Sequence, residues 1–195
     1  FAIDGTPADC VYTALHAGER ILGRRPDIVV SGMNQGANLG RDVIYSGTVA
    51  AAREAAQRGI ASLAVSVHPR APLAKAAALA ATVATRLHLG RAQDTQSSSD
   101  PPTPLLNLNI PQGDDWSLRL TRLGKRNYTD EIIFRDDPRG KPYLWIGGSN
   151  VKHEADPQTD TGAWDAGVAS ITPLRIALDE SPHPAWLETL QLTNG

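Results

Sequence analysis

The stretch from Ile28 to Ala56 limits the possible folds of this chain more than any other. It opens with three consecutive apolar residues, Ile28-Val29-Val30, rather than with alternating polar and apolar ones. Such a run predicts a strand that is covered on both faces, as in the centre of a parallel sheet. A glycine-rich segment over residues 31–46 follows, and residues 48–56 then have the composition of a helix. This order of segments indicates an α/β fold.

The neighbouring segments continue the alternation of helices and strands. They are a helix capped by Thr6 over residues 7–22, a strand over residues 60–67, a helix over residues 72–89, a surface loop over residues 90–104 and a strand over residues 105–110. Helices and strands alternating at this spacing predict a doubly wound, mostly parallel sheet. We assign residues 1–110 to this core.

Residues 111–195 change character and form a separate C-terminal region. Two β-like runs, residues 127–134 and 143–147, flank a turn-rich segment and predict a hairpin arm over about residues 127–148. Three of its four aromatic residues are hard to bury in so small a unit, so we expect them to pack on a partner subunit, with packing on the chain's own main domain as the alternative. The four aromatic residues are Tyr128, Phe134, Tyr143 and Trp145. A strand over residues 168–172 and a terminal helix over residues 185–192 complete the region.

Composition argues against nucleic acid polymers and membranes as partners of this chain, and it also bears on the cellular location. The net charge of -2 gives no general attraction for nucleic acid polymers. No apolar run approaches the roughly 18 residues that span a bilayer, so we expect no membrane partner. The single cysteine, Cys10, fits a reducing, cytoplasmic location. The only methionine is Met33, and the chain opens on the strand-like Phe1-Ala2-Ile3, so we expect further residues upstream.

The segment Ser31–Gly40 is the first candidate for a binding site. It follows a predicted strand, and ligands of open α/β sheets bind beyond the carboxyl ends of such strands. Gly32 and Gly36 allow the backbone to come close to a ligand, while the amides of Asn34 and Asn38 suit a phosphate or a hard cation. Asn and Gly are also the residues of ordinary turns, which leaves a purely structural role open.

The segment Ser46-Gly47-Thr48 opens the next helix. A hydroxyl N-cap, a glycine and a second hydroxyl leave backbone N–H groups free at the positive end of a helix, which suits an anion such as phosphate. A plain N-cap without a ligand is the alternative. Neither segment pairs a nucleophile with a base, and no GxxxxGK[ST] occurs. Hydrolysis at this site would therefore need a metal-activated water.

Several blocks of this sequence, in the same order, resemble the signature segments of SurE 5′-nucleotidases. They are residues 4–11, 31–40, 44–52, 107–111, 121–124, 137–140, 159–160 with Ala163, and 170–174. The resemblance runs nearly from end to end, and its first three blocks are highly specific in combination.

The resemblance implies a Rossmann-like main domain with a protruding β-hairpin and a swapped C-terminal element, assembled as homodimers or homotetramers. It implies hydrolysis of nucleoside 5′-monophosphates that depends on a divalent cation, Mg²⁺ or Mn²⁺, with tolerance for 3′-nucleotides and short polyphosphate. Asn34 matches a family metal ligand and so carries the catalytic role. The resemblance also places Ser46, Gly47 and Thr48 in the phosphate region. From the glycine-rich segment we add Gly32, Gly36 and Asn38 to the expected phosphate-binding residues.

The sequence departs from the family at the remaining metal ligands. Family members place an Asp-Asp-Gly segment at the end of their first strand, and a serine from a later loop completes the metal site, but these segments would precede Phe1. One amide oxygen cannot hold an ion that takes about six oxygen ligands. We therefore expect this polypeptide alone to be inactive. A nucleotide-binding module without catalysis is the alternative, while the absence of GxGxxG disfavours a dinucleotide-dependent oxidoreductase.

Overall fold

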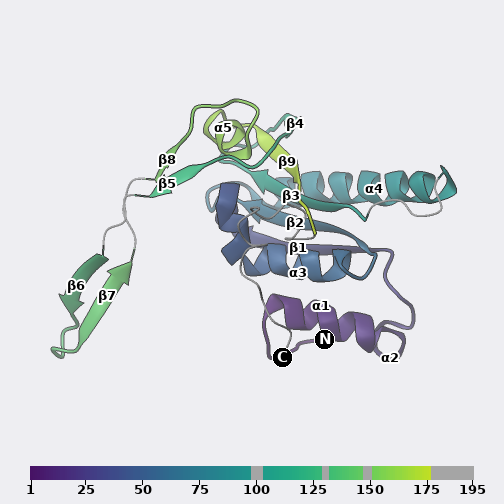
Figure 1. Cartoon of the computed structure of the whole chain (residues 1–195), viewed down its shortest axis with the longest axis horizontal. Coiled ribbons are helices and arrows are strands. Elements are labelled where there is room, and N and C mark those ends of the chain that lie inside the picture. Colours follow the sequence, from purple (N-terminus) through teal and green to yellow (C-terminus); the bar gives the residue numbers. More distant parts are fainter. Residues whose placement is uncertain (98–102, 129–131, 147–150, 177–195) are drawn as a thin grey trace, which may run out of the picture.

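A five-stranded sheet forms the centre of the protein (Figure 1). The computed structural model describes residues 1–97, 103–128, 132–146 and 151–176. The strand order is β1-β2-β3-β9-β4, in which β9 runs antiparallel to β3 and the other neighbours are parallel. The strands are β1 (Ile28–Gln35), β2 (Ala61–Val67), β3 (Leu105–Ile110), β4 (Leu118–Leu120) and β9 (Ala169–Pro173). The predicted doubly wound, mostly parallel sheet is confirmed.

Helices cover both faces of the sheet (Figure 1). α3 (Gly47–Ala56) lies against one face, and α4 (Leu73–Ser97) lies against the other. α1 (Pro7–His16) and the short α2 (Gly18–Leu22) form a further layer outside α3. The described residues also contain two short helices, the 3-10 helix η1 (Gly40–Tyr45) and α5 (Asp160–Asp165). Among the described residues, no helix combines the length and hydropathy needed to cross a bilayer.

The core consists of two apolar clusters, one on each face of the sheet. Every residue of β2 is buried, so this strand is the centre of both clusters. On one face, Val65 and Val67 pack with Ala76 and Ala80 of α4. On the other face, Ala64 packs with residues of α3. The small alanine side chains let both helices approach the sheet closely. Because the sheet is tightly packed between them, the ends of its strands are held in fixed positions.

Strand β1 differs from the sequence prediction in position and length. It is an edge strand of the described sheet, so the prediction of a strand in the centre of the sheet was wrong. Helices α3 and α4 contact its two faces, although Val30 is still 48% exposed. The strand also continues beyond Val30 to Gln35, into the predicted loop. Its register against β2 shifts between Ser31 and Asn34, and Gly32 lies in this bulge with φ 131°. Glycine adopts that conformation readily, which lets the strand resume after the bulge.

Two predicted helices also have different bounds. The single helix predicted over residues 7–22 is two helices, α1 and α2, because the backbone of Ala17 leaves the helical conformation before Gly18. The helix predicted to end at Leu89 continues through Gly90 to Ser97. A glycine inside a helix costs only about 1 kcal/mol, which the rest of a long helix can offset. The predicted surface loop over residues 90–104 therefore began too early.

The hairpin arm extends away from the sheet (Figure 1). β6 (Ile132–Asp136) and β7 (Pro142–Ile146) form the predicted antiparallel hairpin, and β5 (Arg126–Tyr128) pairs with β8 (Val151–His153) at its base. Phe134 is 80% exposed, so the main domain does not cover its ring. The terminal helix predicted over residues 185–192, and with it the swapped element, lies outside the described residues. The division at residue 110 stays a prediction, since β4 and β9 join the same sheet as β1–β3.

Candidate functional site

A row of polar residues crosses the carboxyl edge of the sheet. Asn34 of β1 lies opposite Ser66 of β2, which lies opposite Asn109 of β3, which lies opposite Ser170 of β9. Ser66, Asn109 and Ser170 are almost fully buried. Buried polar side chains are normally hydrogen-bonded. Ser66 and Asn109 follow this rule, whereas no described residue bonds to Oγ of Ser170.

Asn38 is the main partner of this polar row. Its backbone N–H donates to Oδ1 of Asn109 at 2.9 Å, and its side-chain Nδ2 donates to Oγ of Ser66 at 2.7 Å. Its carbonyl oxygen accepts from Nδ2 of Asn107 at 2.8 Å and from Nδ2 of Asn109 at 3.0 Å. These four hydrogen bonds fix the segment after β1 onto the ends of β2 and β3. The side-chain nitrogen that we predicted to donate to phosphate is therefore already bonded within the protein.

Asn34 presents its side-chain oxygen at the same edge. Its Nδ2 donates to the carbonyl oxygen of Gly36 at 2.8 Å, and Gly36 N in turn donates to Val67 O at 2.9 Å. No other described residue donates a hydrogen bond to Oδ1 of Asn34, and the residue is only partly buried. The side chain therefore lies in a polar setting, with an oxygen that suits a hard cation.

Gly32 is required for the close approach of two strands. A Cβ atom at this position would lie 2.4 Å from the carbonyl oxygen of Val65. Gly32 also lines an apolar groove between β1 and α4, together with Met33 and Ala80. Close packing against β2 is therefore sufficient to explain why residue 32 is a glycine. The role of Gly32 in phosphate binding stays a prediction.

Ser46 begins α3 beside a hollow of about 360 Å³, which we call the carboxyl-edge hollow. Its Oγ accepts from the N–H of Val49 at 3.1 Å, which confirms the predicted N-cap. The N–H groups of Gly47 and Thr48, in the first turn, have no acceptor inside the helix. The hollow is lined by Ala37, Asn38, Asp42, Tyr45 and Ser46. The structure thus brings Asn38 and Ser46 together. The other predicted site residues are not among the described residues that line the hollow; they are Gly32, Asn34, Gly36, Gly47 and Thr48.

Asp160 joins the start of η1 to the segment between β4 and β5, although sequence reasoning did not select it as a site residue. Its carboxylate accepts from the N–H groups of Gly40 at 2.8 Å, Gly124 at 2.7 Å and Thr161 at 2.8 Å. Burial raises the pKa of the Asp160 carboxyl, and these N–H donors oppose that shift. A Cβ at Gly124 would lie 2.0 Å from Oγ1 of Thr161, so only glycine fits there. The sequence signal for this residue was that residues 159–160 belong to a block that resembles the SurE signature segments.

An ion pair joins the hollow to the base of the arm. Asp42 of η1 lines the hollow, and its Oδ2 accepts from Nη1 of Arg126 in β5. Both side chains are less than one quarter exposed, at 24% and 18%. Breaking a partly buried pair of this kind leaves one charge poorly compensated. The position of η1 therefore depends on β5.

The described residues do not complete a site for a divalent cation. Within the described part of the chain, no group of three or more His, Cys, Asp or Glu side chains is close enough to hold a metal ion. Asn34 offers one oxygen, whereas Mg²⁺ takes about six oxygen ligands and usually one or two carboxylates. A cation at this edge would need ligands other than those described here.

Comparison with known proteins gives consistent similarities over the whole chain. A sequence model of the family described as "Survival protein SurE" matches residues 1–130. A protein of Sorangium cellulosum named 5′-nucleotidase SurE is 55% identical over 197 residues, covering 100% of this chain and 75% of the relative. A protein of the same name from Anaeromyxobacter sp. is 43% identical, covering 98% of this chain and 72% of the relative.

A solved structure has the same fold. The crystal structure of a SurE protein from Aquifex aeolicus superimposes with a TM-score of 0.68 at 34% sequence identity. The superposition covers 91% of this chain and 70% of that one. Sequence and fold therefore agree on one family.

Proposed function

This chain belongs to the SurE family, and from that membership we propose that it acts as a 5′-nucleotidase, a phosphoric monoester hydrolase that converts nucleoside 5′-monophosphates to nucleoside and phosphate. We include 3′-nucleotides and short polyphosphate as secondary substrates. The relatives in Sorangium and Anaeromyxobacter are named for 5′-nucleotidase activity. The observation that best supports the proposal is the carboxyl-edge hollow, where the start of α3 meets the polar ends of the sheet.

In this proposal the phosphate group binds at the first turn of α3. The free N–H groups of Gly47 and Thr48 and the hydroxyl of Thr48 donate to phosphate oxygens, and Ser46 fixes the start of the helix. Gly36 and Asn38 shape the rim, because their hydrogen bonds to β2 and β3 hold the loop in place. These donors need no rearrangement when a phosphate arrives, which favours binding and charge stabilisation.

Activity in this proposal depends on a divalent cation, Mg²⁺ or Mn²⁺, with Oδ1 of Asn34 as one ligand. The family resemblance places two carboxylate ligands in an Asp-Asp-Gly segment that these 195 residues lack. We therefore propose that this polypeptide alone releases little phosphate. About one quarter of the Sorangium relative has no counterpart here, since this chain covers 75% of it.

The test is phosphate release from AMP and GMP with Mg²⁺ or Mn²⁺. We expect little release by the chain alone, and metal-dependent release once it is joined to the segment of the Sorangium relative that it does not match. In the joined protein, Asn34→Ala should lower kcat/KM by about 10- to 100-fold or more, because even the loss of an outer-shell partner of a metal typically costs that much. Asn127→Ala, an exposed asparagine in β5, is the matched control and should retain activity.

Two results would contradict parts of the proposal. Full activity of Asn34→Ala would remove Asn34 from the ligand set. Equilibrium binding of AMP by the joined protein, with no phosphate released under any metal, would favour a nucleotide-binding module without catalysis.

We further propose that the protein works as a homodimer or homotetramer in the cytoplasm. The exposed apolar side chains of the arm support self-association, and the single Cys10 is compatible with a reducing compartment.

A further inference from the structure

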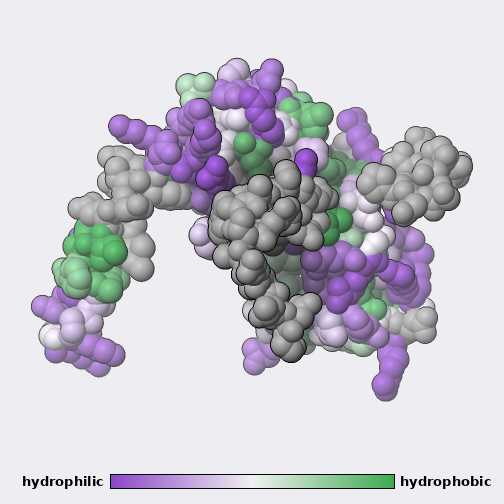
Figure 2. Space-filling view, viewed as in Figure 1, coloured by the Kyte–Doolittle hydropathy of each residue, from purple (hydrophilic) through white to green (hydrophobic). Residues whose placement is uncertain are grey.

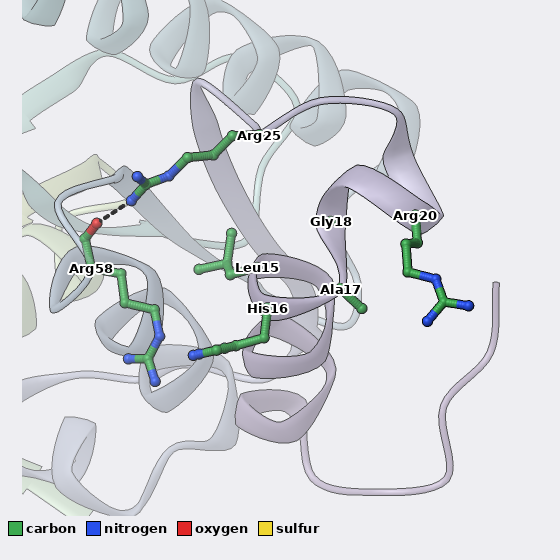
Figure 3. A pocket seen from close by; sticks show the side chains of 7 residues that line it. All are labelled: Leu15, His16, Ala17, Gly18, Arg20, Arg25 and Arg58. Atoms are coloured by element: carbon green, nitrogen blue, oxygen red, sulfur yellow. Dashed lines mark hydrogen bonds between the residues drawn. The ribbon is translucent and has the colours of Figure 1, made fainter.

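A second concave site lies at the opposite, amino edge of the sheet. It has a volume of about 520 Å³ and lies between the turn that joins α1 to α2, the segment before β1 and the end of α3 (Figure 3). We call it the basic pocket, because its described lining comprises His16, Arg20, Arg25 and Arg58, with Leu15 and the Ala17-Gly18 turn. Arg25 precedes β1 and Arg58 precedes β2, so the pocket is separate from the carboxyl-edge hollow.

The pocket concentrates positive charge in a chain whose net charge is -2. None of the described residues that line it is acidic. In Figure 3 the side chains of His16 and Arg58 point toward one another, Arg25 reaches toward the backbone of Arg58, and Arg20 points away from all three. The group that can act on one ligand is therefore His16, Arg25 and Arg58.

Internal contacts hold these three side chains in place. Nη2 of Arg25 donates to the carbonyl oxygen of Arg58 at 2.5 Å. The guanidinium of Arg58 lies over the ring of Tyr12, with 5.0 Å between Cζ and the ring centroid, and pairs with Glu54 at 2.9 Å. The ring of His16 stacks on Tyr12 at 4.0 Å, and its Nδ1 lies 2.9 Å from the Tyr12 carbonyl oxygen. Glu54 offsets the positive charge of one guanidinium group. Because these contacts already order the arginine side chains, binding of a ligand would cost little further side-chain entropy.

We propose that the basic pocket binds a phosphate-class oxyanion. Two guanidinium groups present planar sets of N–H donors, which match the oxygens of phosphate better than a point charge does. A volume of about 520 Å³ also leaves room for more than one phosphate group. The anion is either free phosphate or the phosphate group of a nucleotide. This inference does not depend on the proposed catalytic activity, because the pocket shares no residue with the carboxyl-edge hollow.

The test is a calorimetric titration of the 195-residue chain with inorganic phosphate, up to about 10 mM, in buffer containing EDTA. EDTA removes divalent cations, so binding at a cation-dependent site is excluded. Arg25→Gln keeps a donor for the Arg58 carbonyl and removes the charge, and it should weaken binding at least about tenfold. Arg25→Lys should weaken it less. Arg24→Gln is the matched control, because Arg24 is 79% exposed and pairs with Asp27 instead.

A parallel titration with AMP distinguishes the two sources of the anion. Tighter binding of phosphate would identify the free ion as the ligand of the basic pocket, and tighter binding of AMP would identify a nucleotide. In either case, Arg25→Gln must weaken the tighter binding. Absence of binding by both ligands would overturn the proposal. So would binding that Arg25→Gln and Arg58→Gln leave unchanged while circular dichroism shows both variants folded.

Discussion

At the scale of single residues, Asp160 shows how one buried carboxylate can fix distant segments. It accepts hydrogen bonds from the N–H groups of Gly40, at the start of η1, and of Gly124, before β5. Both segments contribute to the surroundings of the carboxyl-edge hollow, through Asp42 and its partner Arg126. A buried carboxylate is unfavourable unless hydrogen bonds compensate it, and here three backbone donors do so.

We expect Asp160→Ala to destabilise the protein by about 3 kcal/mol, because three buried N–H groups lose their acceptor at about 1 kcal/mol or more each. Urea unfolding followed by circular dichroism would measure the loss. Asp165→Ala provides a control, since the Asp165 side chain is 55% exposed and lies at the other end of α5. An equal effect of the two substitutions would contradict the special role of Asp160.

Asp160→Asn should also remove one source of the pH dependence of folding stability. Burial raises the folded-state pKa of Asp160 above its ordinary value of 3.8, so the folded state holds this proton more tightly than the unfolded state does. Its contribution to stability is complete below that ordinary value and is lost as pH rises through the raised pKa. The stability of the wild type relative to Asp160→Asn should therefore fall as pH rises above 3.8 and through the raised pKa. A constant difference across this range would be inconsistent with the raised pKa.

The same residues show which site features the sequence can reveal. Ser46 was predicted as an N-cap from the local pattern Ser46-Gly47-Thr48, and its partner in the structure, Val49, is only three residues away. Asp160 has one partner 120 residues away and another 36 residues away, and no local pattern predicts such contacts. Asn34 and Asn38 were selected as ligand donors, but the sequence did not show that Asn38 would bond to Ser66 and Asn109.

At the scale of elements, the sequence predicted strands β2 and β3 and helix α3 closely, because an apolar run or a capped alanine-rich segment defines each one. It misplaced the ends of β1 and α4, where glycines were taken as breaks. Gly32 sits inside a bulged strand, and Gly90 sits inside a helix. A glycine permits a break but does not force one, since neighbouring packing decides whether the element continues.

Gly90→Ala tests the continuation of α4. A Cβ at this position would meet no atom within 4 Å, and alanine favours a helix over glycine, so the substitution should raise stability by about 1 kcal/mol. Thermal unfolding would measure the change. Gly124→Ala is the contrasting variant, because its Cβ would lie 2.0 Å from Oγ1 of Thr161 and should destabilise the fold. Lower stability of Gly90→Ala would indicate that the helix ends before residue 90.

At the scale of the whole molecule, the sheet separates two sites with different chemistry. The carboxyl edge carries the polar row and the hollow at the start of α3, whereas the amino edge carries the basic pocket. The sequence could indicate a mostly parallel sheet, but the position of β9 between β3 and β4 depends on long-range pairing. The basic pocket also escaped sequence reasoning, because His16, Arg25 and Arg58 come from three separate segments.

The hairpin arm presents an apolar face that the main domain does not cover. Phe134 pairs with Leu144 across β6 and β7, and Ile132 lies two residues away on the same face of the hairpin. These side chains are 80%, 53% and 59% exposed, respectively. Figure 2 shows hydrophobic residues gathered on the arm near the main body and hydrophilic residues at its tip. An isolated two-stranded hairpin is only marginally stable in water, so burial against a second copy would stabilise this one.

We therefore expect the double variant Phe134→Ser with Leu144→Ser to shift the protein toward smaller assemblies. Removing two apolar side chains from an interface should cost about 2 kcal/mol or more of association free energy, and light scattering after size exclusion would report the mass. Arg135→Ser, on the opposite face of β6, is the matched control. An unchanged mass for the double variant would place the contact between subunits elsewhere. The apolar face of the arm would then be unexplained, because its side chains would face water in the assembled protein.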